Sequence, residues 1–154
     1  MKKAELILAN FDARIPKIEI RPKNTDSKVI FSSKMYDEET DEIISVKIHF
    51  TNVAAIDFRV NLFDCMIGAE AFGLYCIRDK EFIESVTRGI FDRRKEMFLF
   101  EGNYNYDEDD EHDMLNCYDV SGDFRNSMDN YAAFIQNVDG GEYIIIAKQV
   151  RVER

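Results

Sequence analysis

The sequence predicts a single α+β domain over residues 1–154, with a mostly antiparallel sheet of about six to eight strands and one main helix packed on one face. Most apolar stretches alternate with polar residues at period two, and a single stretch has helical spacing. The 2 prolines and 7 glycines do not cluster into a linker that would separate two domains. A chain of 154 residues that is 45% hydrophobic can bury one core.

The first half of the chain contains four runs with the alternation that is typical of half-buried strands. They cover residues 17–21, 29–33, 44–50 and 56–62. Pro22 ends the first run, because proline lacks the N–H that a ladder needs. We expect the third and fourth runs to form an antiparallel pair. The charged stretch 37–42 between the second and third runs predicts an exposed turn.

A further apolar run at 72–77 predicts another strand, and from Lys80 the period changes. Phe82, Ile83, Val86 and Ile90 recur at helical spacing, and Asp79 stands where an N-cap residue is expected. Basic residues at 93–95 suit a helix C-terminus. The pattern therefore predicts a helix over about 80–94, followed by a strand-like run at 97–100.

The last third predicts a β-hairpin that joins runs 131–138 and 143–150 through the Gly-containing segment 139–142. This register places Val138 opposite Tyr143, Gln136 opposite Ile145, and Phe134 opposite Ala147. Both faces of the hairpin are largely apolar. A hairpin of this kind is expected inside the sheet, covered on both sides.

Composition favours a cytoplasmic protein that does not bind a membrane. No stretch approaches the roughly 18 apolar residues of a membrane-spanning helix. Glu5, Asn10 and Asp12 interrupt any secretory h-region near the start. The three cysteines, Cys65, Cys76 and Cys117, are odd in number and widely spaced, which predicts that all three are unbridged.

The net charge of -10 is concentrated in one part of the chain. Residues 101–129 contain 10 of the 30 acidic residues and 1 of the 20 basic residues, so the segment has a net charge of -9. The remainder has 20 acidic and 19 basic residues and is nearly neutral. This partition predicts one strongly negative region on a balanced body.

Catalytic and metal-binding patterns are incomplete. Alternating Asn103, Asn105, Asp107 and Asp109 resemble the start of an EF-hand loop, but Glu108 replaces its glycine and Met114 replaces its bidentate glutamate. We therefore expect no bound metal and no other cofactor. His49 and His112 lie in no catalytic signature, and no family motif links His112 with the nearby Cys117. The chain is therefore predicted not to be an enzyme.

Nucleic-acid binding is disfavoured, because affinity for phosphates depends on lysine and arginine. A basic protein partner fits better. Two tyrosines lead directly into a dense acidic stretch, and together they could supply desolvated contact area and charge steering. The predicted partner-binding residues are Tyr104, Tyr106, Asp107, Glu108, Asp109, Asp110, Glu111 and Asp113.

In its size, its charge and its β-rich body with an acidic segment, the chain resembles the small acidic immunity proteins of bacterial toxin systems. The resemblance implies inhibition of a cognate toxin, often a basic nuclease. Two alternatives are a phage-type inhibitor that mimics DNA and a metal-dependent hydrolase that uses the acidic cluster. A structural subunit that uses the apolar hairpin as an interface is a further alternative.

Overall fold

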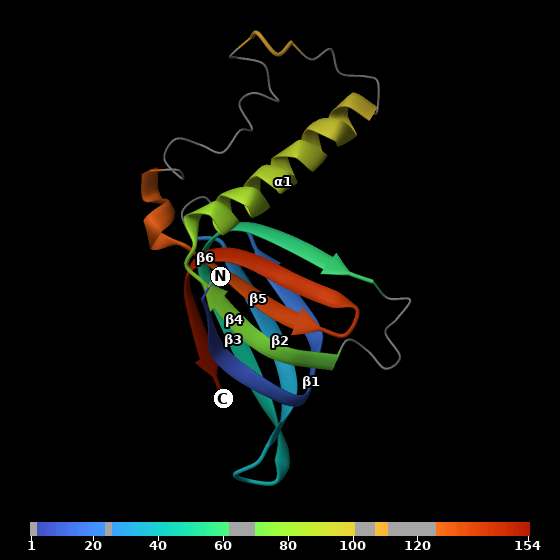
Figure 1. Cartoon of the computed structure of the whole chain (residues 1–154). Coiled ribbons are helices and arrows are strands. Elements are labelled where there is room, and N and C mark those ends of the chain that lie inside the picture. Colours follow the sequence, from blue (N-terminus) through green and yellow to red (C-terminus); the bar gives the residue numbers. More distant parts are fainter. Residues whose placement is uncertain (1–2, 24–25, 62–69, 101–106, 111–125) are drawn as a thin grey trace. The chain divides into compact units, whose positions relative to one another are not determined.

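The computed structural model describes residues 3–23, 26–61, 70–100, 107–110 and 126–154. These residues contain six strands and one long helix (Figure 1). In chain order the elements are β1 (Ala4–Arg21), β2 (Lys28–Asp37), β3 (Glu42–Val60), β4 (Glu70–Ile77), α1 (Lys80–Phe100), the short 3-10 helix η1 (Met128–Asn130), β5 (Ala132–Val138) and β6 (Gly141–Glu153). The predicted α+β class with an antiparallel sheet is confirmed.

The six strands form a closed barrel in the order β1-β2-β3-β6-β5-β4. Every neighbouring pair is antiparallel, including the pair β1 and β4 that closes the barrel. Closure removes the unpaired strand edges that an open sheet would present. The β5–β6 hairpin lies between β4 and β3, so its predicted place inside the sheet is confirmed.

The elements of the first half are longer than their sequence patterns indicated. β1 begins at Ala4 and ends at Arg21, directly before Pro22. β2 and β3 form a long hairpin that is paired from Val29↔Phe50 to Asp37↔Glu42. Residues 38–41 form its turn and are exposed, as predicted.

The expected antiparallel pair of strands at 44–50 and 56–62 is wrong, because both runs belong to the single strand β3. Two irregularities bend this strand. Asn52 adopts φ 51, a value that asparagine tolerates better than most residues, and a register shift follows between Val53 and Ala55. The backbone N–H groups of Asn52 and Val53 donate to Asp26 Oδ1 at 3.1 Å and to the Ser27 carbonyl at 2.9 Å. Residues 51–55, which separate the two sequence runs, therefore form a bend within one strand and not a turn between two strands.

The predicted register of the last hairpin is wrong by two residues. Val138 pairs with Gly141, Gln136 with Tyr143, and Phe134 with Ile145. The loop contains two residues, Asp139 and Gly140, and Gly141 already belongs to β6. A shift of two residues keeps each side chain on its predicted face, since the period of a strand is two.

Aromatic rings fill the barrel interior. The centroid of the Phe31 ring lies 5.2 Å from that of Phe50 and 5.6 Å from that of Tyr143, while Phe50 lies 5.6 Å from Phe134. The rings of Phe31, Phe50 and Phe134 are almost fully buried. Gln136 is also buried and its Nε2 donates to the Gly73 carbonyl at 3.2 Å. This interior is a packed core.

The chain divides into two compact units, Met1–Asp79 with Asn130–Arg154, and Lys80–Asp129. The first unit contains the barrel and the second contains α1. The helix begins directly after Asp79, but it continues to Phe100, so the strand predicted at 97–100 is wrong. Between Gly89 and the end of α1 there is no glycine or proline that would end the helix. The four apolar residues at 97–100 are too few to distinguish a strand period from a helix period.

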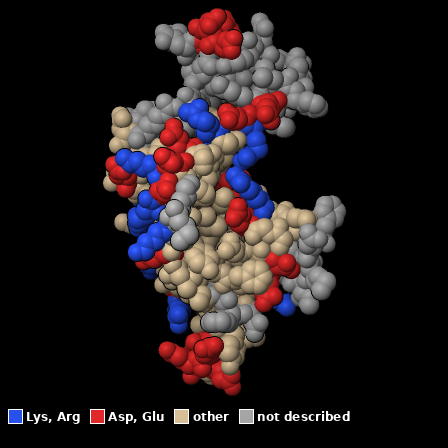
Figure 2. All heavy atoms as spheres, in the orientation of Figure 1, with Lys and Arg blue, Asp and Glu red and all other residues tan. Residues whose placement is uncertain are grey.

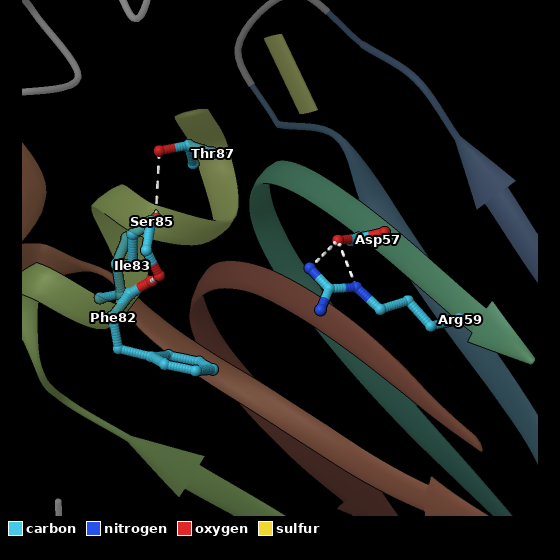
Figure 3. Close-up of polar contacts among 6 residues, drawn as sticks. All are labelled: Asp57, Arg59, Phe82, Ile83, Ser85 and Thr87. Carbon is cyan, nitrogen blue, oxygen red and sulfur yellow. Dashed lines mark hydrogen bonds and ion pairs between the residues drawn. The ribbon is translucent and has the colours of Figure 1, made fainter. Parts of the chain in front are cut away.

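The side chains of α1 support the helical assignment. Ser85 Oγ donates to the Phe82 carbonyl at 2.8 Å and Thr87 Oγ1 donates to the Ile83 carbonyl at 3.1 Å (Figure 3). Ile83 and Val86 are buried, as their helical spacing predicted. The packing of α1 on one face of the sheet stays a prediction, as does a single domain over 1–154. Within the described residues, no helix combines the length and the apolar character of a membrane span.

Cys76 on β4 is a free cysteine, and its side chain is buried in the barrel core. Burial raises the pKa of its thiol. We expect no modification of Cys76 by a maleimide on the native protein within an hour, and complete modification in denaturant, as followed by peptide mass spectrometry. Rapid native labelling of Cys76 would contradict its burial. Cys65 and Cys117 lie outside the described residues.

Candidate partner-binding surface

The acidic run, defined here as the acids at 107–111 and 113, is described at four of its six positions. Asp107, Glu108, Asp109 and Asp110 are all exposed. The Asp109 N–H donates to Asp107 Oδ1 at 3.0 Å, and the Asp110 N–H donates to the Asp107 carbonyl at 3.4 Å. These contacts form a turn of the kind that aspartate favours. The turn presents four consecutive carboxylates to solvent.

The remaining predicted partner-binding residues, Tyr104, Tyr106, Glu111 and Asp113, lie outside the described residues. The same holds for Asn103 and Asn105 of the incomplete EF-hand pattern and for His112. Across the described ranges, no group of three or more His, Cys, Asp or Glu side chains is arranged to hold a metal ion. The predicted absence of a metal site stays a prediction.

A second acidic surface lies on the barrel, at the hairpin tip formed by residues 37–42 between β2 and β3. It contains five acidic residues and no basic residue, at positions Asp37, Glu38, Glu39, Asp41 and Glu42. Figure 2 shows the acidic side chains gathered at this end of the hairpin. Thr40 Oγ1 donates to Asp37 Oδ2 at 2.9 Å, and Tyr36 Oη donates to Asp41. The sequence interpretation treated this stretch as a solvated turn only.

Exposed cations gather on the outer face of the barrel close to this tip. Arg14 on β1 is directly opposite Lys34 on β2. Lys34 is opposite Ser45, and Lys47 lies two residues further along β3. We call Arg14, Lys34 and Lys47 the basic cluster. Arg14 is also directly opposite Glu70 on β4, and Lys47 is directly opposite Glu153 on β6, so acids flank the cluster on both sides. Sequence reasoning missed it, because its members are spread over more than thirty positions and meet only through strand pairing.

Asp57 is the one charged residue that is buried within the described part of the chain. Its Oδ2 accepts hydrogen bonds from Arg59 Nε at 2.9 Å and from Arg59 Nη2 at 2.7 Å (Figure 3). This contact raises the pKa of the Arg59 guanidinium. The arrangement is an ion pair between two residues of one strand, so we assign Asp57 a structural role.

His49 lies on the polar face of β3, as predicted. Its Nε2 is 3.1 Å from Glu153 Oε2, and Arg151 Nη2 is 3.4 Å from the same carboxylate oxygen. The group joins β3 to β6 at the barrel surface. Because the carboxylate is shared between two nitrogen-bearing side chains and is half exposed, it stabilises the barrel wall only modestly.

Comparison with known proteins adds no identity to these surfaces. The chain matches no protein-family model, no curated protein and no solved structure. Its function is therefore inferred from the charge and exposure of its own residues.

Proposed function

We propose that the protein is a non-catalytic inhibitor in the cytosol that binds a basic protein partner through its acidic run. The observation that carries the proposal is the partition of charge. Residues 101–129 have a net charge of -9, while the rest of the chain has 20 acidic and 19 basic residues. A localised charge of this size steers an oppositely charged partner to one place on the molecule.

The exposure of Asp107, Glu108, Asp109 and Asp110 supports this proposal, because steering and pairing both require accessible carboxylates. Tyr104 and Tyr106 precede them and would supply the aromatic contact that anchors such interfaces. We further propose that the partner is a bacterial toxin with a basic active site, such as a nuclease. An immunity protein would occlude that site and block its contact with nucleic acid.

The proposal is tested by affinity capture from the native host with matched baits. One bait is the wild-type chain, and a second, the neutralised-run variant, has amides in place of the five acids at 107–111. A third, the neutralised-tip variant, has amides in place of the five acids at 37–42 and therefore the same change in net charge.

We expect wild type and the neutralised-tip variant to retain one basic protein that the neutralised-run variant loses. The purified partner should bind in a 1:1 complex and lose its own activity on binding. The proposal is wrong if the partner binds all three baits equally, or if the complex forms without inhibition.

A further inference from the structure

The β2–β3 hairpin continues past the strands on either side of it. Toward the hairpin tip, the pairing of β1 with β2 ends at Lys34, and the pairing of β6 with β3 ends at Lys47. The two strands of the hairpin stay paired with each other as far as Asp37↔Glu42. Figure 1 shows this end of the hairpin extending beyond the rest of the barrel. The protruding part is therefore a two-stranded ribbon.

The ribbon leaves one edge of β3 without a neighbouring strand over residues 42–46. Within the described part of the chain, no strand pairs with this edge. Every second residue of the edge directs its N–H and C=O groups away from β2, because these groups alternate between the two sides of a strand. Glu42, Ile43 and Ser45 are also exposed, whereas none of the residues at 35–37 on the opposite edge of the ribbon is. An extended chain can add a strand at the β3 edge.

This edge also exposes an apolar side chain. Val46 points into the barrel core, so the alternating residues Ile43 and Ser45 lie on the outer face. Ile43 is 74% exposed, more than any other large hydrophobic residue in the described part of the chain. An added strand would place a Cβ atom roughly 5 Å from that of Ile43, the usual separation of directly opposed residues. We therefore expect an apolar residue of the added strand at this position.

Charge determines which extended chain fits. None of the five acids of the hairpin tip forms an ion pair within the described residues. Asp37 and Glu42 are directly opposite each other, an arrangement of like charges that is unfavourable. The nearest base along the ribbon is Lys34, which lies three residues from Asp37, or about 10 Å, and points to the other face. Basic side chains of an added strand would relieve this repulsion.

We propose that the β3 edge at 42–46 binds an extended basic segment of another protein by strand addition. Added antiparallel to β3, the segment continues the line of β6 and runs toward the hairpin tip. Its apolar residue lies beside Ile43, and the basic residues that follow lie beside Glu42 and Asp41. Backbone hydrogen bonds supply affinity, and the alternating side chains supply specificity. The site is separate from the acidic run, so the inference goes beyond the proposed function.

A basic segment fits this edge better than a second copy of the chain does. The sequence at 42–46 contains one acid and no base, so a second β3 edge would place no basic residue beside Glu42. The net charge of -10 on each copy adds a general repulsion. Nucleic acid is disfavoured, because its phosphates would meet the five acids of the tip.

A synthetic peptide tests the proposal directly. The probe is a capped peptide of sequence Thr-Thr-Val-Val-Lys-Lys-Lys, which places valine beside Ile43 and lysine beside Glu42. We expect a Kd on the order of 100 µM, because the contact is much smaller than a standard interface. Amide hydrogen exchange followed by NMR should slow at every second residue of 42–46. At a peptide concentration ten times Kd, the effect should be about 10-fold.

Two N-methylated peptides separate strand addition from simple charge attraction. One carries N-methyl groups at its odd positions and the other at its even positions, and both keep the three lysines. A methyl group removes the N–H donor, so the peptide that is methylated on the side facing β3 should bind at least ~10-fold more weakly. The other peptide should bind like the parent, because its methyl groups point to solvent.

Variants of the protein test the named side chains. Ile43→Thr should weaken peptide binding at least ~3-fold, because it removes the apolar contact. The neutralised-tip variant should weaken it at least ~5-fold at low salt. The neutralised-run variant has the same change in net charge and should keep the wild-type affinity within about 2-fold. Unchanged thermal unfolding of each variant serves as the folding control.

The inference is overturned if wild type does not bind the peptide at ~2 mM, or if both N-methylated peptides bind equally. Equal losses in the neutralised-tip and neutralised-run variants would also contradict it. If the same amides become protected as the concentration of the chain alone rises, a second copy occupies the edge and the inference is wrong. Because the neutralised-run variant keeps the β3 edge, failure of the proposed function and failure of this inference are distinguishable.

Discussion

Gly141→Ala is expected to destabilise the protein by about 3 kcal/mol, a large fraction of the 5–15 kcal/mol that typically separates folded from unfolded states. A Cβ at Gly141 would lie 1.9 Å from the Arg59 carbonyl oxygen and 3.1 Å from the Val60 Cα. Both clashing groups are backbone of β3, the strand that pairs with β6 at this point. Gly141 also adopts φ 155, which residues with a Cβ rarely adopt.

The clash cannot be relieved by a small movement of the backbone. The Asn61 N–H donates to the Gly140 carbonyl at 2.8 Å, which ties the end of β3 to the hairpin turn. Moving the turn away would break this hydrogen bond and the ladder at Val60↔Gly141. Urea unfolding followed by circular dichroism should show a lower midpoint with an unchanged slope, and the melting temperature should fall by roughly 10 °C.

Gly89→Ala is the matched control. Gly89 lies within α1, and the nearest atom to an added Cβ is Arg93 Nη1 at 3.7 Å, an ordinary van der Waals contact. Alanine favours helix more than glycine, so this change should stabilise the protein by ~0.5–1 kcal/mol. Equal effects of the two substitutions, or a stable Gly141→Ala protein, would show that the close approach of β3 to the hairpin turn is wrong.

The local sequence pattern was sufficient to predict most strands and the helix. It was not sufficient to predict which runs form one continuous strand or which strands pair. Alternating residues such as Val46, Ile48 and Phe50 identify a strand, because each period-two position has a fixed face. The continuity of β3 depends on hydrogen bonds from Asn52 and Val53 to the 26–27 segment, which no local pattern contains. Barrel closure likewise depends on pairing of β1 with β4, for example Leu8↔Leu74.

The two candidate surfaces also differ in whether the sequence alone reveals them. The acidic run is contiguous, so its charge could be counted directly from the sequence. The basic cluster could not be found from the sequence, because Arg14 and Lys34 become neighbours only through the register of β1 and β2. The near-neutral count for the rest of the chain concealed a separation within the barrel. In Met1–Asp79 with Asn130–Arg154, 5 of the 16 acids belong to the hairpin tip, while the 14 basic residues lie elsewhere.

The neutralised-run variant is expected to associate with the basic partner at least ~10-fold more slowly than wild type at low ionic strength. The acids at 107–110 are exposed, so their main effect on binding is long-range attraction during encounter. The difference should shrink as salt is added, since the Debye length falls to ~8 Å at physiological strength. Stopped-flow association over a range of salt concentrations measures both effects, and unchanged thermal unfolding of the variant serves as the folding control.

Tyr104→Ala and Tyr106→Ala should change mainly the dissociation rate constant, and not the association rate constant. An aromatic side chain buried at an interface contributes ~2 kcal/mol or more, and its loss appears mainly as faster dissociation, by roughly 30-fold. The neutralised-tip variant should associate like wild type, which separates the acidic run from the overall charge. If the neutralised-run and tyrosine variants all bind as wild type does at low and high salt, the acidic run is not the binding surface. The hairpin tip with the exposed Ile43 then becomes the next surface to test, because β5 and β6 are wall strands of the closed barrel and both edges of their hairpin are paired.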